Sequence, residues 1–235
     1  MAKYKTDYRK YVKNGNPKKF IKTLIDGKLS FAVRQSTECT EVLLDDTHIV
    51  YASTSNFPRK KVYLFRLVKN EVNKWLSNNK LILPPNHNSI EYNYEYDCEK
   101  DEMTGTDLNH AYWRIAYTTG LISEKTYIAG LDGDCKPLRL ATISTLGREK
   151  KFQNYNEGLI SKSFVFQKRS EELQNVYKFV RLTCFDYMYE ASKLLGKDFF
   201  AWKTDCIYYK NTKENINKIQ EFFDSKNLTY KQLGY

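Results

Sequence analysis

The chain has 235 residues, of which 41% are hydrophobic and 15% aromatic, so it can bury a core and is not a disordered tail. Its 38 Lys and Arg against 28 Asp and Glu give a net charge of +10, which favours anionic partners, and nucleic acid is the commonest of these. Because no apolar stretch is long enough to span a bilayer, we expect no membrane partner.

The 5 cysteines are scattered singly without a CxxC pair, and the 3 histidines lie far apart. This spacing argues against a structural zinc site and favours reduced thiols in a reducing compartment. The first residues are charged and lack the apolar segment of a signal peptide. We therefore predict a soluble protein of the cytoplasm, or of the host cytoplasm if the chain is viral.

The first 28 residues are strongly basic. They contain nine Lys and Arg, among them Lys10, Lys18 and Lys19, with aromatic residues between them. Such a segment can hold a phosphate backbone while its aromatic rings stack on bases, or it can be the solvated face of a helix. Residues 60–79 follow the pattern of an amphipathic helix with a basic outer face, which adds Lys60 and Lys61 to the candidate nucleic-acid contacts.

Paired prolines in residues 83–89 cannot continue that helix and suggest a linker. Residues 29–56 alternate like strands, so residues 1–90 are predicted to form a small basic α/β lobe, and residues 91–235 a second domain. In that domain we expect a strand ending at 105–106, helices over 107–122, 137–150 and 171–195, a hairpin turning at 204–205, a helix capped by Thr212 and a final strand. This order predicts an α+β fold.

Two aspartates are placed where the chain turns. Asp107 follows the predicted strand, and Asp205 lies at the tip of the hairpin. If the hairpin pairs with that strand, the two carboxylates meet at one edge of a sheet, where they would need a cation between them, and Mg²⁺ or Mn²⁺ suits such oxygen ligands. The alternative is that each aspartate only accepts hydrogen bonds from its own turn.

Three short motifs carry a resemblance to a known family. "DLNHAY" at 107–112, "RLATISTLG" at 139–147 and "KTDCIYY" at 203–209 resemble, in order, the first palm motif, the fingers helix and the hairpin motif of family B DNA polymerases, nearest to the viral, protein-primed branch. The resemblance covers roughly residues 100–235. It implies a palm-like antiparallel sheet with packed helices and reduced fingers.

The resemblance also implies roles for individual residues. Asp107 and Asp205 would bind the catalytic Mg²⁺ or Mn²⁺ ions, with the Leu108 carbonyl as a further ligand. Tyr112 would lie under the sugar of the incoming nucleotide and exclude ribose, and Arg139 would hold its triphosphate. Ser144 and Gly147 would line the nascent base pair.

The chain also departs from the family pattern. Lys203 replaces the first aspartate of the hairpin motif, Ile143 the fingers asparagine, Leu146 the tyrosine and Trp113 the proline. Three functions therefore remain open: a minimal polymerase or primer-synthesising enzyme acting on a DNA template-primer with nucleoside triphosphates, a non-catalytic palm that binds nucleic acid beside replication proteins, and a metal-dependent nuclease. Retention of both aspartates favours the enzyme, because each carboxylate repels a nucleic-acid backbone.

Overall fold

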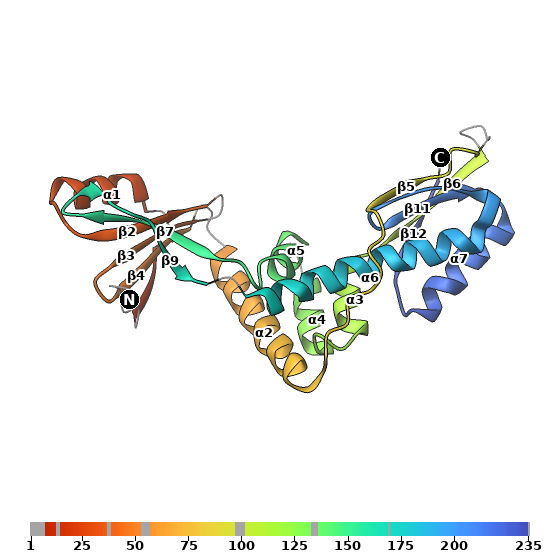
Figure 1. Cartoon of the computed structure of the whole chain (residues 1–235), viewed down its shortest axis with the longest axis horizontal. Coiled ribbons are helices and arrows are strands. Elements are labelled where there is room, and N and C mark those ends of the chain that lie inside the picture. The colour runs from red at the N-terminus through yellow and green to blue at the C-terminus, as the bar shows by residue number, and fades with distance from the viewer. Residues whose placement is uncertain are drawn as a thin grey trace. The chain divides into compact units, whose positions relative to one another are not determined.

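A computed structural model of the chain (Figure 1) describes residues 8–12, 15–36, 39–52, 57–96, 102–132, 136–168 and 170–234. The protein has the mixed α+β fold that the sequence predicts. It divides into two compact units. Unit 1 comprises Met1–Tyr63 and Gly147–Glu171, and unit 2 comprises Leu64–Leu146 and Glu172–Tyr235.

Unit 1 is built around one sheet. Its strands are β1 (Tyr8–Val12), β2 (Phe31–Gln35), β3 (Cys39–Leu44), β4 (Thr47–Ala52), β7 (Lys150–Asn156), β8 (Leu159–Ile160) and β9 (Phe164–Gln167). They run in the order β1-β4-β3-β2-β7-β8, with β9 also paired to β7. Only the β1–β4 pair is parallel among these described strands. Val33 on β2 stands opposite both Val42 on β3 and Gln153 on β7, so a segment more than a hundred residues later completes the sheet.

Helix α1 (Pro17–Asp26) covers one face of this sheet. It begins at Asn16, whose side chain accepts a hydrogen bond from the Lys19 N–H, and Pro17 follows at the first helical position, where its missing N–H is not needed. The core on this face consists of Leu24, Phe31, Val33, Val42, Ile49 and Tyr51. The other face buries Ala32, Leu43 and Phe152 against Phe164.

Unit 2 contains an antiparallel sheet of β5 (Ile90–Tyr92), β6 (Met103–Leu108), β10 (Phe199–Lys203), β11 (Cys206–Lys210) and β12 (Tyr230–Leu233), in the order β12-β6-β11-β10-β5. Helices α6 (Glu171–Leu195) and α7 (Lys213–Ser225) run along it in Figure 1, and a 3-10 turn at Gly196–Asp198 ends α6. The Trp202 ring meets Tyr189 of α6 edge-on with centroids 6.3 Å apart, and Tyr230 lies 5.9 Å from Phe223 of α7. Both helices therefore pack on the same face, and the opposite face of the sheet carries Asp107.

Four further helices lie in the described part of the chain: α2 (Phe57–Asn78), α3 (Ala111–Thr118), α4 (Glu124–Leu131) and α5 (Lys136–Ser144). The Glu71 carboxylate of α2 accepts hydrogen bonds from the Ser123 N–H and hydroxyl and from the Thr126 hydroxyl, at 2.7–2.8 Å. It therefore fixes α2 to the N-terminus of α4. Trp113 of α3 is buried and donates to the Tyr127 carbonyl at 2.9 Å, which joins α3 to α4.

The division into units differs from the predicted boundary near residue 90. The boundary falls inside α2, and the proline-containing linker at 83–89 lies within unit 2. The physical reasons are the Glu71 contacts, which hold most of α2 to α4, and the pairing of β7 with β2, which returns residues 147–171 to unit 1. Unit 1 is therefore made of two separate stretches of chain.

Candidate active site

The structure brings the backbones of Asp107 and Asp205 together, although 98 positions separate them in the chain. Asp107 lies near the end of β6, and Cys206, the residue after Asp205, stands directly opposite it on β11. The Leu108 N–H donates to the Asp205 carbonyl oxygen at 2.9 Å. In an extended strand the N–H and C=O of one residue point to the same neighbour, so the Leu108 carbonyl also faces the hairpin.

The hairpin tip that carries Asp205 is held in place on several sides. Thr204 has a φ of 61°, a left-handed conformation that a β-branched residue adopts only under constraint, at a cost of about 1 to 3 kcal/mol. Its N–H donates to the Ser89 carbonyl at 2.7 Å, and its carbonyl oxygen lies 3.7 Å from the Cys184 thiol of α6. These contacts of Thr204 hold the backbone at Asp205, at one end of the central strands of the sheet.

Asp107 is turned toward the face of the sheet away from α6 and α7. Residues that pair across antiparallel strands project to the same face, which groups Asp107 with Cys206 on one side and with Lys231 of β12 on the other. The Lys231 ammonium lies 3.0 Å from the Asp107 carboxylate, whose side chain is 27% exposed. Asp107 thus already has a cationic partner within the protein.

The two carboxylates act on the same cysteine. Burial is the main cause that raises the pKa of the Cys206 thiol to about 11, and the negative charges of Asp107 and then Asp205 raise it further, against a hydrogen bond from Tyr208. Asp205 also contributes, after burial, to the raised pKa values of Cys184 and Tyr112. The Asp205 carboxylate is therefore near enough to Cys206 on β11 and to Cys184 on α6 for its charge to act on the pKa of both thiols.

On α6 the site includes an arginine that the sequence motifs do not point to. The Arg181 guanidinium lies 5.9 Å from the Tyr177 ring centroid and 5.8 Å from that of Phe185, and its charge lowers the pKa of Tyr112 against the other contributions. Its Nε is buried without a hydrogen-bond partner, and no ion pair of Arg181 occurs in the described ranges. A single arginine beside the apolar stripe of residues 171–195 is the signal that could have identified it.

Tyr112, the predicted steric gate, is half-buried on α3 and meets the Tyr177 ring edge-on, with centroids 6.3 Å apart. It therefore lies with Arg181 and within the electrostatic reach of Asp205. The negative charge of Asp205 contributes to the raised pKa of Tyr112, after burial, Cys184 and Tyr177. Its role as a gate stays a prediction.

The other predicted nucleotide-binding residues have partners of their own. Arg139 is buried and donates to the Gly130 carbonyl at 2.7 Å and to His110 Nδ1 at 2.9 Å. It reaches the segment after Asp107, but binding a triphosphate would require it to exchange these partners. The Ser144 hydroxyl donates to the Ala141 carbonyl of its own helix at 3.5 Å. Gly147 is buried at the start of the second stretch of unit 1, where its carbonyl accepts from the Ser170 N–H.

Of the predicted nucleic-acid contacts, Lys10 on β1 and Lys18 and Lys19 on α1 are exposed and belong to unit 1. Lys60 and Lys61 lie in α2, and their side chains are outside the described part of the structure. The described residues therefore place the exposed candidates in the unit that does not contain the aspartates.

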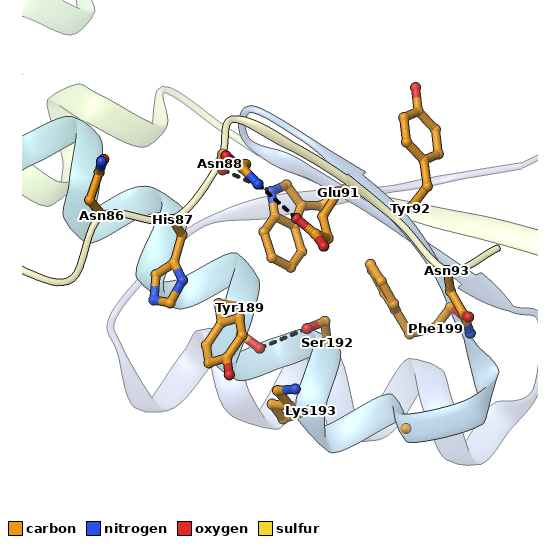
Figure 2. Close-up of a pocket in the computed structure, with 12 residues that line it drawn as sticks. Asn86, His87, Asn88, Glu91, Tyr92, Asn93, Tyr189, Ser192, Lys193 and Phe199 are labelled. Carbon is orange, nitrogen blue, oxygen red and sulfur yellow. Dashed lines mark hydrogen bonds between the residues drawn. The ribbon is translucent and has the colours of Figure 1, made fainter. Parts of the chain in front are cut away.

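A cavity of about 530 Å³ lies elsewhere in unit 2, between residues 86–93 and the C-terminal half of α6 (Figure 2). It contains neither aspartate. His87 hydrogen-bonds Asp186 at 3.0 Å and stacks on Tyr189 at 4.1 Å, and the Lys193 ammonium lies 4.8 Å from the centroid of the same ring. These contacts fasten the proline-containing linker to α6, which also steadies Ser89, the partner of the hairpin tip.

Asp107, Asp205 and the Leu108 carbonyl are the candidate ligands for a divalent cation, and the Lys231 ammonium already lies 3.0 Å from the Asp107 carboxylate. Within the described ranges no three His, Cys, Asp or Glu side chains form a metal-binding group, so the protein ligands would be two carboxylates and the Leu108 carbonyl. Mg²⁺ keeps several waters and is commonly bound by one or two carboxylates together with substrate phosphates. An ion held by these residues alone would therefore need waters or substrate phosphates as its remaining ligands.

No protein-family model, curated protein or solved structure matches the chain. Among the helices in the described ranges, none is long and apolar enough to cross a membrane.

Proposed function

We propose that unit 2 is a palm-like domain that transfers a nucleotide to the 3′ end of a template-bound nucleic-acid strand. One observation carries the proposal: the pairing of β6 with β11 places Asp107 opposite Cys206 and joins Leu108 to Asp205, at one end of the central strands of an antiparallel sheet whose opposite face is covered by helices. This arrangement agrees with the motif order that resembles the family B palm. Nucleoside triphosphates and a DNA template-primer are the expected substrates.

The two aspartates would hold the divalent cations, with the Leu108 carbonyl directed to the same place. Bound Mg²⁺ or Mn²⁺ would stabilise the negative charge that develops on the attacking and leaving oxygens. The contribution of the protein would be position: the strained Thr204 turn and the Leu108–Asp205 hydrogen bond hold the backbone from which the two carboxylates project. Such positioning is what an in-line phosphoryl transfer requires.

Arg181 is proposed to hold a phosphate of the substrate. A guanidinium presents five N–H donors and matches phosphate geometry, and Arg181 has a buried Nε without a partner beside Tyr112. An unsatisfied buried donor costs about 1 to 3 kcal/mol, and an anionic ligand would remove that cost. Arg181 would therefore take a role that the resemblance implies for Arg139, whose donors are already engaged.

Lys231 supports an alternative. Because its ammonium already neutralises Asp107, the site is stable without a cation, as expected of a degenerate palm that binds nucleic acid and performs no chemistry. For catalysis, Lys231 must yield Asp107 to the cation. The two functions therefore differ in what removal of the lysine does.

Primer extension with labelled nucleotides tests the proposal. We expect Asp107→Asn and Asp205→Asn each to reduce extension more than about a hundredfold, since loss of even an outer partner of a metal ligand costs about 10- to 100-fold. Glu221→Gln, which removes an exposed carboxylate of α7, is the matched control and should extend normally. Lys231→Ala should lower the Mg²⁺ concentration that gives half-maximal extension.

Absence of extension with Mg²⁺ and with Mn²⁺, together with nucleic-acid binding that ignores both ions and the Asp205→Asn change, would reject the enzyme and favour the binding protein. Arg181→Lys keeps the charge but loses the planar donor set, so we expect it to raise the KM for nucleotide more than it lowers kcat.

A further inference from the structure

The whole net charge of the protein resides in unit 1. Unit 1 contains 19 Lys and Arg against 9 Asp and Glu, whereas unit 2 contains 19 of each, so unit 1 carries the full excess of +10 and unit 2 is neutral. Unit 1 has 88 of the 235 residues, which concentrates that charge on the smaller body. The unit that contains Asp107 and Asp205 has no surplus charge with which to attract a polyanion.

Most of the described cations of unit 1 are exposed and have no acidic partner. Arg34 and Lys150 pair with the buried Glu41, and Lys151 pairs with Glu149. Within the described ranges, seven exposed lysines make no ion pair: Lys10, Lys18, Lys19, Lys22, Lys28, Lys162 and Lys168. Among the described residues of unit 1 no ion pair offsets the repulsion between these lysines, so a bound polyanion would stabilise the unit.

Helix α1 shows this imbalance most clearly. Lys18 and Lys19 occupy its first turn, which contains no acidic residue. A positive charge there opposes the helix dipole, which favours anions at the N-terminus by about 0.3 to 1 kcal/mol each. Phe20, Ile21 and Leu24 face the core, so the lysines point outward. The exposed side of α1 thus carries Lys18, Lys19 and Lys22 without a described ion pair, and its one acidic residue, Asp26, lies at the C-terminal end.

The second stretch of unit 1 folds onto α1. The turn between β7 and β8 lies on the C-terminal end of α1: the Gly158 N–H donates to the Leu29 carbonyl at 3.0 Å, and the Glu157 N–H to the Ser30 hydroxyl at 3.3 Å. Gly158 has a φ of +78° and approaches α1 so closely that a Cβ would lie 2.5 Å from the Ile25 carbonyl oxygen. Lys162 and Lys168 therefore belong to the same folded body as the α1 lysines.

We infer that unit 1 is the part of the protein that binds the sugar–phosphate backbone of nucleic acid, through α1 together with residues 147–171. The choice of nucleic acid among polyanions rests on the function proposed for unit 2. The proposed binding surface includes residues 147–171. It does not include the outer face of α2 in unit 2, although the basic amphipathic pattern of residues 60–79 predicts contacts along that helix.

The test compares charge removal at two places in the full chain. Lys18→Gln, Lys19→Gln and Lys22→Gln are combined in one variant, and Lys162→Gln with Lys168→Gln in a second. The matched control combines Lys74→Gln, Lys80→Gln and Lys125→Gln, three exposed lysines of unit 2 that make no ion pair within the described ranges. The α1 variant and the control lose the same net charge, so any difference reports position.

Binding of a labelled duplex is measured by fluorescence anisotropy over roughly 50 to 200 mM salt. All chains carry Asp205→Asn, and a chelator removes divalent cations, so the result does not depend on catalysis. We expect the α1 variant to reduce the slope of log K against log salt by at least about 0.9, the value for one lost phosphate contact, and by up to about 2.7 for three. The Lys162/Lys168 variant should also reduce it, and the control should not.

Equal slopes for the α1 variant and the control would overturn the inference. So would loss of binding to vesicles containing anionic phosphatidylserine in the α1 variant while its DNA binding stays unchanged, because the partner would then be a lipid surface. A reduced slope together with failure of primer extension by the wild-type protein would support the inference and reject only the catalytic function of unit 2.

Discussion

Glu41 is buried in the sheet of unit 1 and is 2% exposed, yet it remains charged. Burial alone would raise its pKa, but the hydrogen bond with His48 at 2.8 Å and the positive charges of Lys150 and Arg34 outweigh burial and lower the pKa from 4.5 to about 2. A pKa difference of this size between folded and unfolded chain is worth about 3 kcal/mol, at 1.36 kcal/mol for each pH unit.

The sign follows from the direction of the shift. Because the folded pKa is depressed, Glu41 stabilises the fold fully above about pH 4.5, and this contribution disappears as the pH falls toward 2. Glu41→Gln removes it at every pH and leaves Arg34, His48 and Lys150 without their anion, so we expect unit 1 to lose about 3 kcal/mol at neutral pH. More than half of the difference between the two proteins should vanish by about pH 3.

The assay must report on unit 1. All 3 tryptophans, Trp75, Trp113 and Trp202, belong to unit 2, so their fluorescence follows the wrong unit. Peptide-resolved hydrogen exchange of β2–β4, measured from neutral to acid pH for wild type and Glu41→Gln, gives the free energy of opening of the sheet that contains Glu41. A difference that is absent at neutral pH, or that does not change with pH, would refute the electrostatic reasoning.

Two further predictions concern unit 2. In Gly130→Ala the new Cβ would lie 2.3 Å from the buried Trp113 ring, and the resulting overpacking, about 1 to 3 kcal/mol, should exceed the gain of up to about 1 kcal/mol in helix propensity. Urea unfolding followed by tryptophan fluorescence measures the change in the free energy of unfolding. Gly234→Ala, where a new Cβ meets open space, is the control. A Gly130→Ala protein more stable than wild type would contradict the packing around Trp113. With a pKa of about 11, Cys206 has only about one thiolate per thousand molecules at about pH 8. Iodoacetamide should therefore alkylate Cys206 at least about a hundredfold more slowly than a small free thiol. Equal rates would contradict the burial of Cys206 beside two carboxylates.

The elements that the sequence predicts well are those with local signals. The apolar spacing over residues 171–195 coincides with α6, Gly196 ends that helix with a φ of +55°, and Thr212 caps α7 by accepting from the Asn215 N–H. By contrast, β7 is mostly polar and becomes a strand because β2, far away in the chain, offers it an edge. No local pattern reveals that pairing, which is why the predicted boundary near residue 90 differs from the division into units 1 and 2.

The candidate site also combines features that the sequence predicts with features that it does not. The strand and the hairpin that carry Asp107 and Asp205 are each recognisable in the sequence, and the register pairs them so that the backbones of the two aspartates lie close together. The Lys231–Asp107 ion pair depends on β12 adding to the other side of β6, and the unpartnered Nε of Arg181 depends on how α6 packs. Both features depend on tertiary packing, which composition and the spacing of residues along the chain do not predict.

The two-part construction of unit 1 has a consequence during synthesis. When the ribosome has released β1 to β4, strand β2 still has an open edge, and its partner β7 emerges only after the helices α2 to α5 have been made. An open strand edge is a template for pairing with other chains. At translation speeds of about 5 to 20 residues per second, the half-finished sheet is exposed for several seconds, so a nascent chain that stalls before residue 150 is the form of this protein most prone to aggregate.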